Sequence, residues 1–118
     1  MKTFRLSAEE IEPLATGLGA CFASDRITVD GSEIGYMYRE ESDNELDSGW
    51  RFLAGDEDDD YMDNAALHGV YDVNTIANYD PAIIPYLSAP VGSGFDRLPG
   101  THEFAPVLDG SEEEWDWQ

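Results

Sequence analysis

Short apolar runs separated by turn-forming residues dominate the sequence between residues 19 and 54. These runs are rich in β-branched and aromatic side chains, and their length predicts strands rather than long helices. Asp30-Gly31 predicts a tight hairpin turn, because such turns need positive backbone dihedral angles and Asp-Gly tolerates them. We therefore expect strands over residues 19–24, 27–29, 34–39 and 50–54.

Helical signals lie on either side of this region. Ser7 and Glu10 have the spacing of a capping box, which predicts a helix over residues 8–16 whose length Pro13 limits. After a brief strand predicted at "GVYDV", Asn74 can cap a helical segment. Pro81 suits a first helical turn and Pro85 strains any continuation, so one helix and two short turns are both compatible with this stretch.

The chain has the length of one domain. We expect a helical segment over residues 1–18, one folded unit over 19–108 and an acidic tail over 109–118 that carries Trp115 and Trp117. "VGSGFDRLPG" is expected to be a glycine-rich connection. It lacks the spacing of a phosphate-binding loop.

The charge of the chain is unusually negative. Against 26 acidic residues stand six basic ones, giving a formal net charge of −20. Residues 40–118 hold 20 of the acids and only two of the bases. Phosphates and anionic lipid surfaces repel such a chain, so nucleic acid and membranes are not expected partners.

The single cysteine and the N-terminus give two further expectations. Cys21 lies in an apolar stretch, where a small buried thiol is the usual interpretation. The N-terminus has no apolar run of signal-peptide length, and no run in the chain is long enough to span a membrane, so a cytoplasmic protein is the simplest expectation.

The run "DSGWRFLAGDEDDDYMDN" sets an aromatic and basic cluster beside six acids. Asp56, Asp58 and Asp60 alternate like the first ligands of a calcium loop, but Tyr61 stands where that loop needs glycine and Leu67 where it needs glutamate. Zinc-ligand spacing and a nucleophile elbow are absent. Pairs of carboxylates are uninformative in so acidic a chain, so catalytic and metal-binding residues are predicted as none.

A binding surface is the remaining interpretation of this run. Dense carboxylates beside aromatic side chains supply charge and anchors for a basic protein partner. The candidate partner-binding residues are Asp47, Trp50, Asp56, Glu57, Asp58, Asp59, Asp60 and Tyr61. In the alternative interpretation, Trp50 and Phe52 are core residues of a strand and the carboxylates only solvate the adjoining loop.

Three segments, "IGYMYRE", "DSGWRFLAGDED" and "YDVNTIANYDPAIIPYLSAPVGSGFDR", resemble immunity protein family 33, a bacterial family first catalogued as domain of unknown function 2185. The resemblance extends from about Gly19 to about Leu108. It implies an α+β domain, here a small, mostly antiparallel sheet with a few short helices packed on it. It also implies a toxin as partner, with no catalytic residues and no cofactor. The family positions present in this chain are Asp47, Ser48, Gly49, Trp50, Arg51, Phe52, Gly55, Asp56 and Glu57.

Each of these positions also has a structural interpretation. Gly49 and Gly55 can supply positive dihedral angles at the strand ends, and Arg51 can pair with Asp47 or Glu57. The leading hypothesis is a non-catalytic acidic protein that neutralises a toxin by occluding a basic surface. The alternatives are a regulatory module that binds a small ligand or divalent metal through the acidic loop, and an uncharacterised hydrolase.

Overall fold

A computed structural model describes residues 4–42 and 44–107. Its sheet has six strands in the order β4-β1-β3-β2-β5-β6. β1 and β3 run parallel, and the other neighbouring pairs are antiparallel. The strands are β1 (Ala20–Ser24), β2 (Tyr36–Arg39), β3 (Asp47–Leu53), β4 (His68–Asp72), β5 (Gly94–Arg97) and β6 (Phe104–Pro106).

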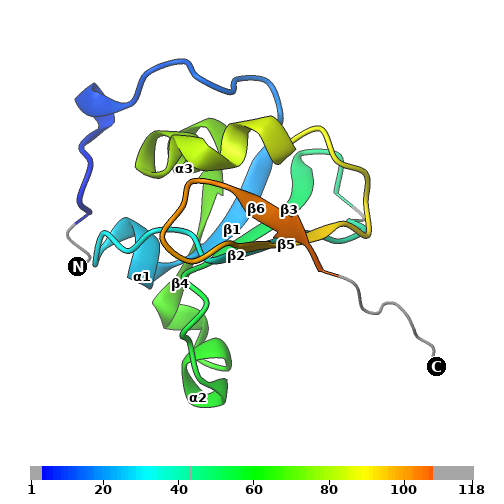
Figure 1. Ribbon diagram of the computed structural model, residues 1–118. Helices are drawn as coiled ribbons and strands as arrows, with labels where there is room; N and C mark the ends of the chain where they lie inside the picture. The colour runs from blue at the N-terminus through cyan, green and yellow to red at the C-terminus, as the bar shows by residue number, and fades with distance from the viewer. Residues whose placement is uncertain (1–3, 43, 108–118) are drawn as a thin grey trace.

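The helices are all short. The α-helices are α1 (Asp25–Thr28), α2 (Asp59–Met62) and α3 (Val73–Tyr79), and the 3₁₀ helices are η1 (Ala8–Glu10), η2 (Ala65–Leu67) and η3 (Pro81–Tyr86). In Figure 1, α3 and η3 lie over one face of the sheet, and α2 projects on the other side. The expectation of an α+β fold with a small, mostly antiparallel sheet is confirmed.

The core lies between the sheet and α3 with η3. Strand side chains that point toward these helices are buried, among them Met37, Trp50 and Phe52, and they meet Ile76 and Ile83 from the helices. Cys21 is also buried here, as predicted. Burial raises the pKa of its thiol, which keeps the sulfur protonated and unreactive.

The predicted N-terminal helix over residues 8–16 is wrong beyond its first turn. The capping box forms, since Glu10 Oε1 accepts a hydrogen bond from Ser7 N at 2.8 Å, but helix η1 ends at Glu10. The following amides bond to α3 instead. Leu14 N and Ala15 N donate to Asn74 Oδ1 at 2.7 and 2.8 Å. Tertiary partners therefore replace the helical ones that Pro13 cannot support.

The predicted strand over residues 27–29 and its hairpin are also wrong. Ser24 Oγ accepts from Arg26 N at 3.1 Å and caps α1, so Ile27 and Thr28 are helical and Val29 is the C-cap. Gly31 has the expected positive φ, 79°, but its amide donates to Ile27 O at 3.2 Å and ends the helix. Asp30-Gly31 thus serves a helix C-terminus, where the same backbone conformation is needed.

The other helices and strands lie closer to their predicted positions. β1, β2 and β4 lie where strands were predicted, while β3 begins three residues before position 50. The segment after β4 forms two short helices, and Pro81 occupies the first turn of the second. The N-cap of α3 is Asp72 rather than Asn74. The predicted glycine-rich connection contains strand β5, which pairs with β2.

No helix among residues 4–42 and 44–107 is long and apolar enough to cross a membrane. The predicted acidic tail over 109–118 lies outside the described residues.

Candidate functional site

Strand β3 carries the Asp47–Phe52 motif through the middle of the sheet. Its side chains alternate, so Trp50 and Phe52 point toward the helices and Arg51 points away from them. Trp50 is 1% exposed, stacks on Phe52 at 5.9 Å and donates from Nε1 to Leu87 O at 3.3 Å. Trp50 is therefore a core side chain, in agreement with the structural interpretation, and it is covered from any partner.

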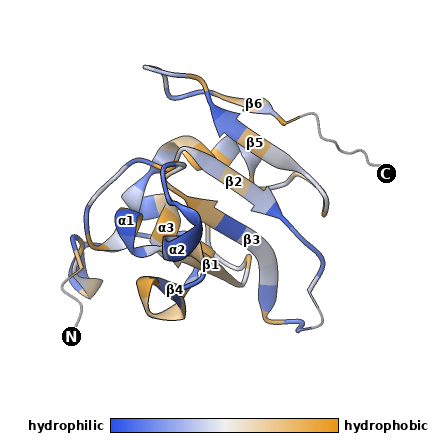
Figure 2. Cartoon of the chain, turned by 90° about the horizontal axis from the view of Figure 1, so that it is seen from below, coloured by the Kyte–Doolittle hydropathy of each residue, from blue (hydrophilic) through white to orange (hydrophobic). Residues whose placement is uncertain are grey.

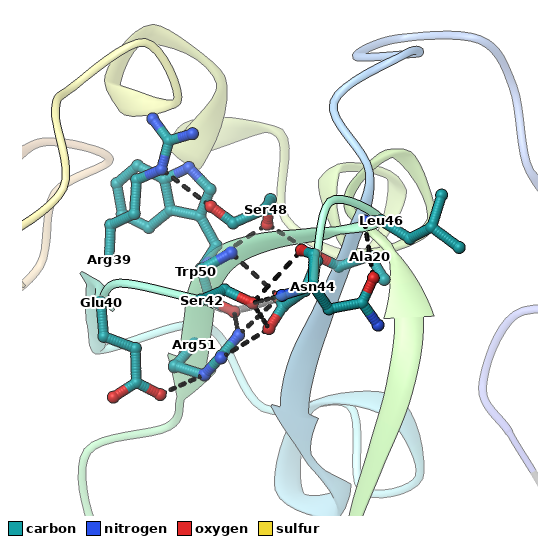
Figure 3. Close-up of polar contacts among 11 residues, drawn as sticks. Ala20, Arg39, Glu40, Ser42, Asn44, Leu46, Ser48, Trp50 and Arg51 are labelled. Carbon is teal, nitrogen blue, oxygen red and sulfur yellow. Dashed lines mark hydrogen bonds and ion pairs between the residues drawn. The ribbon is translucent and has the colours of Figure 1, made fainter.

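The start of the motif shapes the entry to β3 (Figure 3). Ser48 Oγ donates to Ala20 O at 2.6 Å and accepts from Trp50 N at 3.1 Å, which ties β3 to β1. Ser42 Oγ donates to Asp47 Oδ2 at 2.9 Å, and Gly49 N donates to Asp47 Oδ1 at 2.9 Å. The first residues of the motif thus stabilise a loop and a strand end.

Arg51 forms a partly buried ion-pair cluster on the other face (Figure 3). Its guanidinium donates to Glu40 Oε2 at 2.6 Å and to both oxygens of Asp47, at 3.0 and 2.8 Å. It also lies 4.2 Å from the centroid of the Phe22 ring. The expected pair with Asp47 is present, and Glu40 rather than Glu57 is the second carboxylate.

The carboxylate of Asp47 makes the stability of the fold depend on pH. The hydrogen bonds from Arg51 are the main reason that its pKa lies well below the ordinary value, against an opposing effect of burial. A carboxylate with a lowered pKa in the folded state stabilises the fold above its unfolded pKa of about 4 and loses that contribution as the pH falls. We expect Asp47→Asn to reduce the loss of stability below about pH 4. Urea unfolding of both proteins at several pH values would check this, and parallel pH profiles would contradict it.

Gly49 explains why the motif needs glycine at its third position. Its φ is 89°, and a Cβ there would lie 2.2 Å from Glu40 O, which belongs to the backbone beside it. The two strands close on each other here, since Glu40 N donates to Gly49 O at 2.9 Å. We expect Gly49→Ala to destabilise the fold by about 1 to 3 kcal/mol, measured by urea unfolding. Gly92→Ala is the control for the positive φ alone, because a Cβ at Gly92 meets no atom within 4 Å. Equal losses in the two variants would contradict the close approach.

The first three acids of the acidic run bond within the protein. Asp56 binds the guanidinium of Arg26, Glu57 accepts from Ala54 N and Gly55 N at 2.8 Å each, and Asp58 accepts from Tyr61 N at 2.8 Å as the N-cap of α2. Partial burial opposes ionisation of Glu57, but these hydrogen bonds outweigh it and lower its pKa. These three acids of the run therefore have structural roles within the protein.

Asp59 and Asp60 differ from their neighbours. They lie exposed in the first turn of α2 and make no ion pair with the described residues. Tyr61 is half-buried, and its ring contacts the His68 ring edge to face at 5.5 Å. Together with Asp63, which is also exposed and makes no ion pair with a described residue, Asp59 and Asp60 are the members of the run whose charges face solvent.

The structure does not gather the predicted site residues in one place. Asp47 begins β3 and the acidic run follows its end, so a strand of seven residues, about 20 Å long, separates them. The carboxylates of the run diverge toward different protein groups. Among residues 4–42 and 44–107, no cluster of three or more histidine, cysteine or acidic side chains is arranged to hold a metal ion.

Sequence reasoning missed the face of the sheet opposite α3, which we call the open face. Cross-strand register places its side chains in two rows, one across β4, β1, β3 and β2 and one across β3, β2 and β5. The open face consists of Phe22, Tyr36, Tyr38, Arg51, Leu53, Val70 and Asp96. The alternation of Tyr36, Met37 and Tyr38 was the available signal, since alternate strand residues point to opposite faces.

A hollow of about 890 Å³ lies at one side of the open face. Tyr36, Leu53 and Met62 contribute apolar surface to it, and Asp56 and Asp96 are among its acidic residues. Arg97 also reaches it but is paired with the buried Asp80. The hollow therefore joins apolar and aromatic surface with negative charge.

The fold and this surface define a small, strongly acidic α+β domain with one sheet face free of helices over β2 and β5 (Figure 2). Residues 21–107 match the family model of the Immunity protein Imm33 domain, and the chain belongs to that family. The predicted resemblance is thereby confirmed over nearly the same residues. Membership supports an immunity-type role and implies a cognate toxin as partner; the family is generally non-catalytic. Searches of curated proteins and of solved structures found no match.

Proposed function

We propose that the protein is an immunity protein that neutralises a cationic toxin by covering the basic surface with which the toxin works. The observation that carries this proposal is that the positively charged side chains bond to groups within the protein. Each of the five described arginines is held by a contact within the protein, so the acidic excess is left facing outward.

The contacts of the arginines account for this imbalance. Arg26, Arg51 and Arg97 pair with carboxylates. Arg39 donates to the carbonyls of Ser48 and Ala89, and Arg5 donates to the carbonyl of Asp30. Exposed acids such as Asp59, Asp60 and Asp96 make no ion pair with a described residue. The surface offered to a partner is therefore anionic.

An anionic surface suits a particular kind of toxin. Proteins that act on nucleic acid carry clustered lysine and arginine to bind phosphates. Carboxylates at high density compete for the same charges, accelerate the encounter and repel partners of like charge. The same reasoning makes nucleic acid and anionic membranes poor partners for this chain. The proposed partner is thus a basic protein.

Neutralising exposed carboxylates tests the proposal. With the toxin that co-purifies from the native cell or is encoded beside this chain, we expect Asp59→Asn with Asp60→Asn to weaken binding by about three- to tenfold, mainly through slower association. Glu9→Gln with Glu12→Gln is the matched control. It removes equal charge from the N-terminal segment, which packs beside α3. Surface plasmon resonance gives the rates.

Two results would contradict the proposal. One is a co-purified partner with an acidic or neutral binding surface. The other is equal binding by the unchanged protein and by both double variants, since association would then not depend on the exposed charge.

A further inference from the structure

The open face exposes apolar and aromatic side chains side by side. Val70 is 65% exposed and lies in register with Phe22, which is 44% exposed. Tyr36 and Tyr38 stack on each other with ring centroids 5.5 Å apart. Clustered aromatic side chains on a surface are typical of protein interfaces, where they bury large area at small entropic cost.

Hollows with acidic walls surround the two tyrosines. Tyr36 lines the hollow of about 890 Å³ together with Asp96 and Glu33. Tyr38 lines a second hollow of about 190 Å³ with Glu40, and both tyrosines line a third of about 350 Å³ with Glu40 and Glu41. Each approach to the tyrosine pair therefore passes carboxylates.

The cations in these hollows already bond within the protein, and in the third hollow Arg39 donates to the carbonyls of Ser48 and Ala89. Arg51 lies in the second hollow and is held by Glu40 and Asp47. Arg97 lies in the first and is paired with Asp80. Asp96 is exposed and makes no ion pair with a described residue, so its charge remains available. Flat aromatic rings beside the unpaired carboxylate of Asp96 have the chemistry that binds a guanidinium group.

We propose that the open face receives arginine side chains of a cationic protein partner, with guanidinium groups stacked on Tyr36 and Tyr38 and bonded to carboxylates of the adjoining hollows. This inference rests on the proposed function and places its contact on the sheet rather than on the acidic run. The protein shows the same chemistry internally, since Arg51 lies over the Phe22 ring while two carboxylates hold it. A second copy of the chain is a poor occupant, because it brings the same net charge of −20.

Titration of the ¹⁵N-labelled full chain with a nona-arginine peptide at low ionic strength tests the placement. We expect saturable binding with the largest amide shifts in β2 and in its two neighbours, β3 and β5. Tyr36→Ala with Tyr38→Ala should weaken binding by about tenfold, whereas Tyr36→Phe with Tyr38→Phe keeps both rings and should stay within about threefold. Nona-lysine should bind more weakly than nona-arginine, because an ammonium group cannot stack in the same way.

A second variant tests the same placement through an exposed side chain, so its effect on binding is not confused with a loss of folding. Asp96→Asn removes an exposed charge of the open face, and we expect about two- to threefold weaker binding, against no change for Glu9→Gln on the N-terminal segment. Shifts confined to residues 56–63, or equal affinities of Asp96→Asn and Glu9→Gln, would overturn the placement while leaving the proposed function to its own toxin experiment. A dimer in sedimentation, with the open face protected in the dimer, would assign this face to a second copy of the chain. That result would also overturn the proposed placement of the arginine side chains.

Discussion

Replacing Asp80 by alanine is expected to lower the free energy of unfolding by about 3 to 5 kcal/mol, because it leaves a buried arginine without its partner. Asp80 is 7% exposed and forms an ion pair with Arg97, whose side chain is 8% exposed. The same carboxylate accepts from Ile34 N at 3.0 Å and from Ala82 N at 3.2 Å. One side chain thus connects β5, the loop before β2 and the start of η3.

Urea unfolding of a double-mutant cycle measures this effect. Asp80→Ala and Arg97→Met are compared singly and together. We expect the double variant to lose less stability than the sum of the single losses, since neither charge is then left buried alone. Additive losses would show that the two side chains do not act as a pair.

Replacing Trp50 by alanine is expected to cost about 3 to 5 kcal/mol, as for other large core side chains. The indole is enclosed between Phe52, Phe95 and the end of η3, and its removal leaves a cavity that the sheet cannot close. The loss should appear as a lower urea midpoint with an unchanged slope, the mark of lower stability without a change in the surface exposed on unfolding.

Trp50→Phe separates a structural role from a contact role. The smaller ring keeps most of the packing, so the variant should fold with a loss of about 1 to 2 kcal/mol. Its folded form should bind the toxin as the unchanged protein does, because residue 50 is buried. A tenfold loss of affinity in the folded Trp50→Phe variant would instead restore Trp50 as a partner-binding residue.

Local chemistry made several elements predictable from the sequence. The capping box of Ser7 and Glu10 forms, Asp30-Gly31 adopts its positive φ, and Pro81 begins a short helix. These local signals do not specify the type of secondary structure in which they occur. A positive φ serves a hairpin and a helix end equally well, and only the cap from Ser24 selects the helix here.

The two strands that the sequence did not predict, β5 and β6, and the open face depend on contacts between residues that are distant in the sequence. β5 is four residues long and β6 three, and each is stabilised by pairing with a neighbour rather than by its own propensity. Likewise, the acids of the run look equivalent in sequence, but Asp56 meets Arg26 across 30 positions while Asp59 and Asp60 face solvent. Sequence could identify the acidic character of the surface but not which carboxylates remain unpaired.

The salt dependence of toxin binding shows whether an outward excess of carboxylates recognises a cationic partner. The dissociation constant for the co-purified toxin should be measured from about 50 to 500 mM salt, a range that shortens electrostatic reach severalfold. We expect the affinity to fall steeply as the salt concentration rises, with most of the change in the association rate. An affinity that stays constant across this range would contradict it.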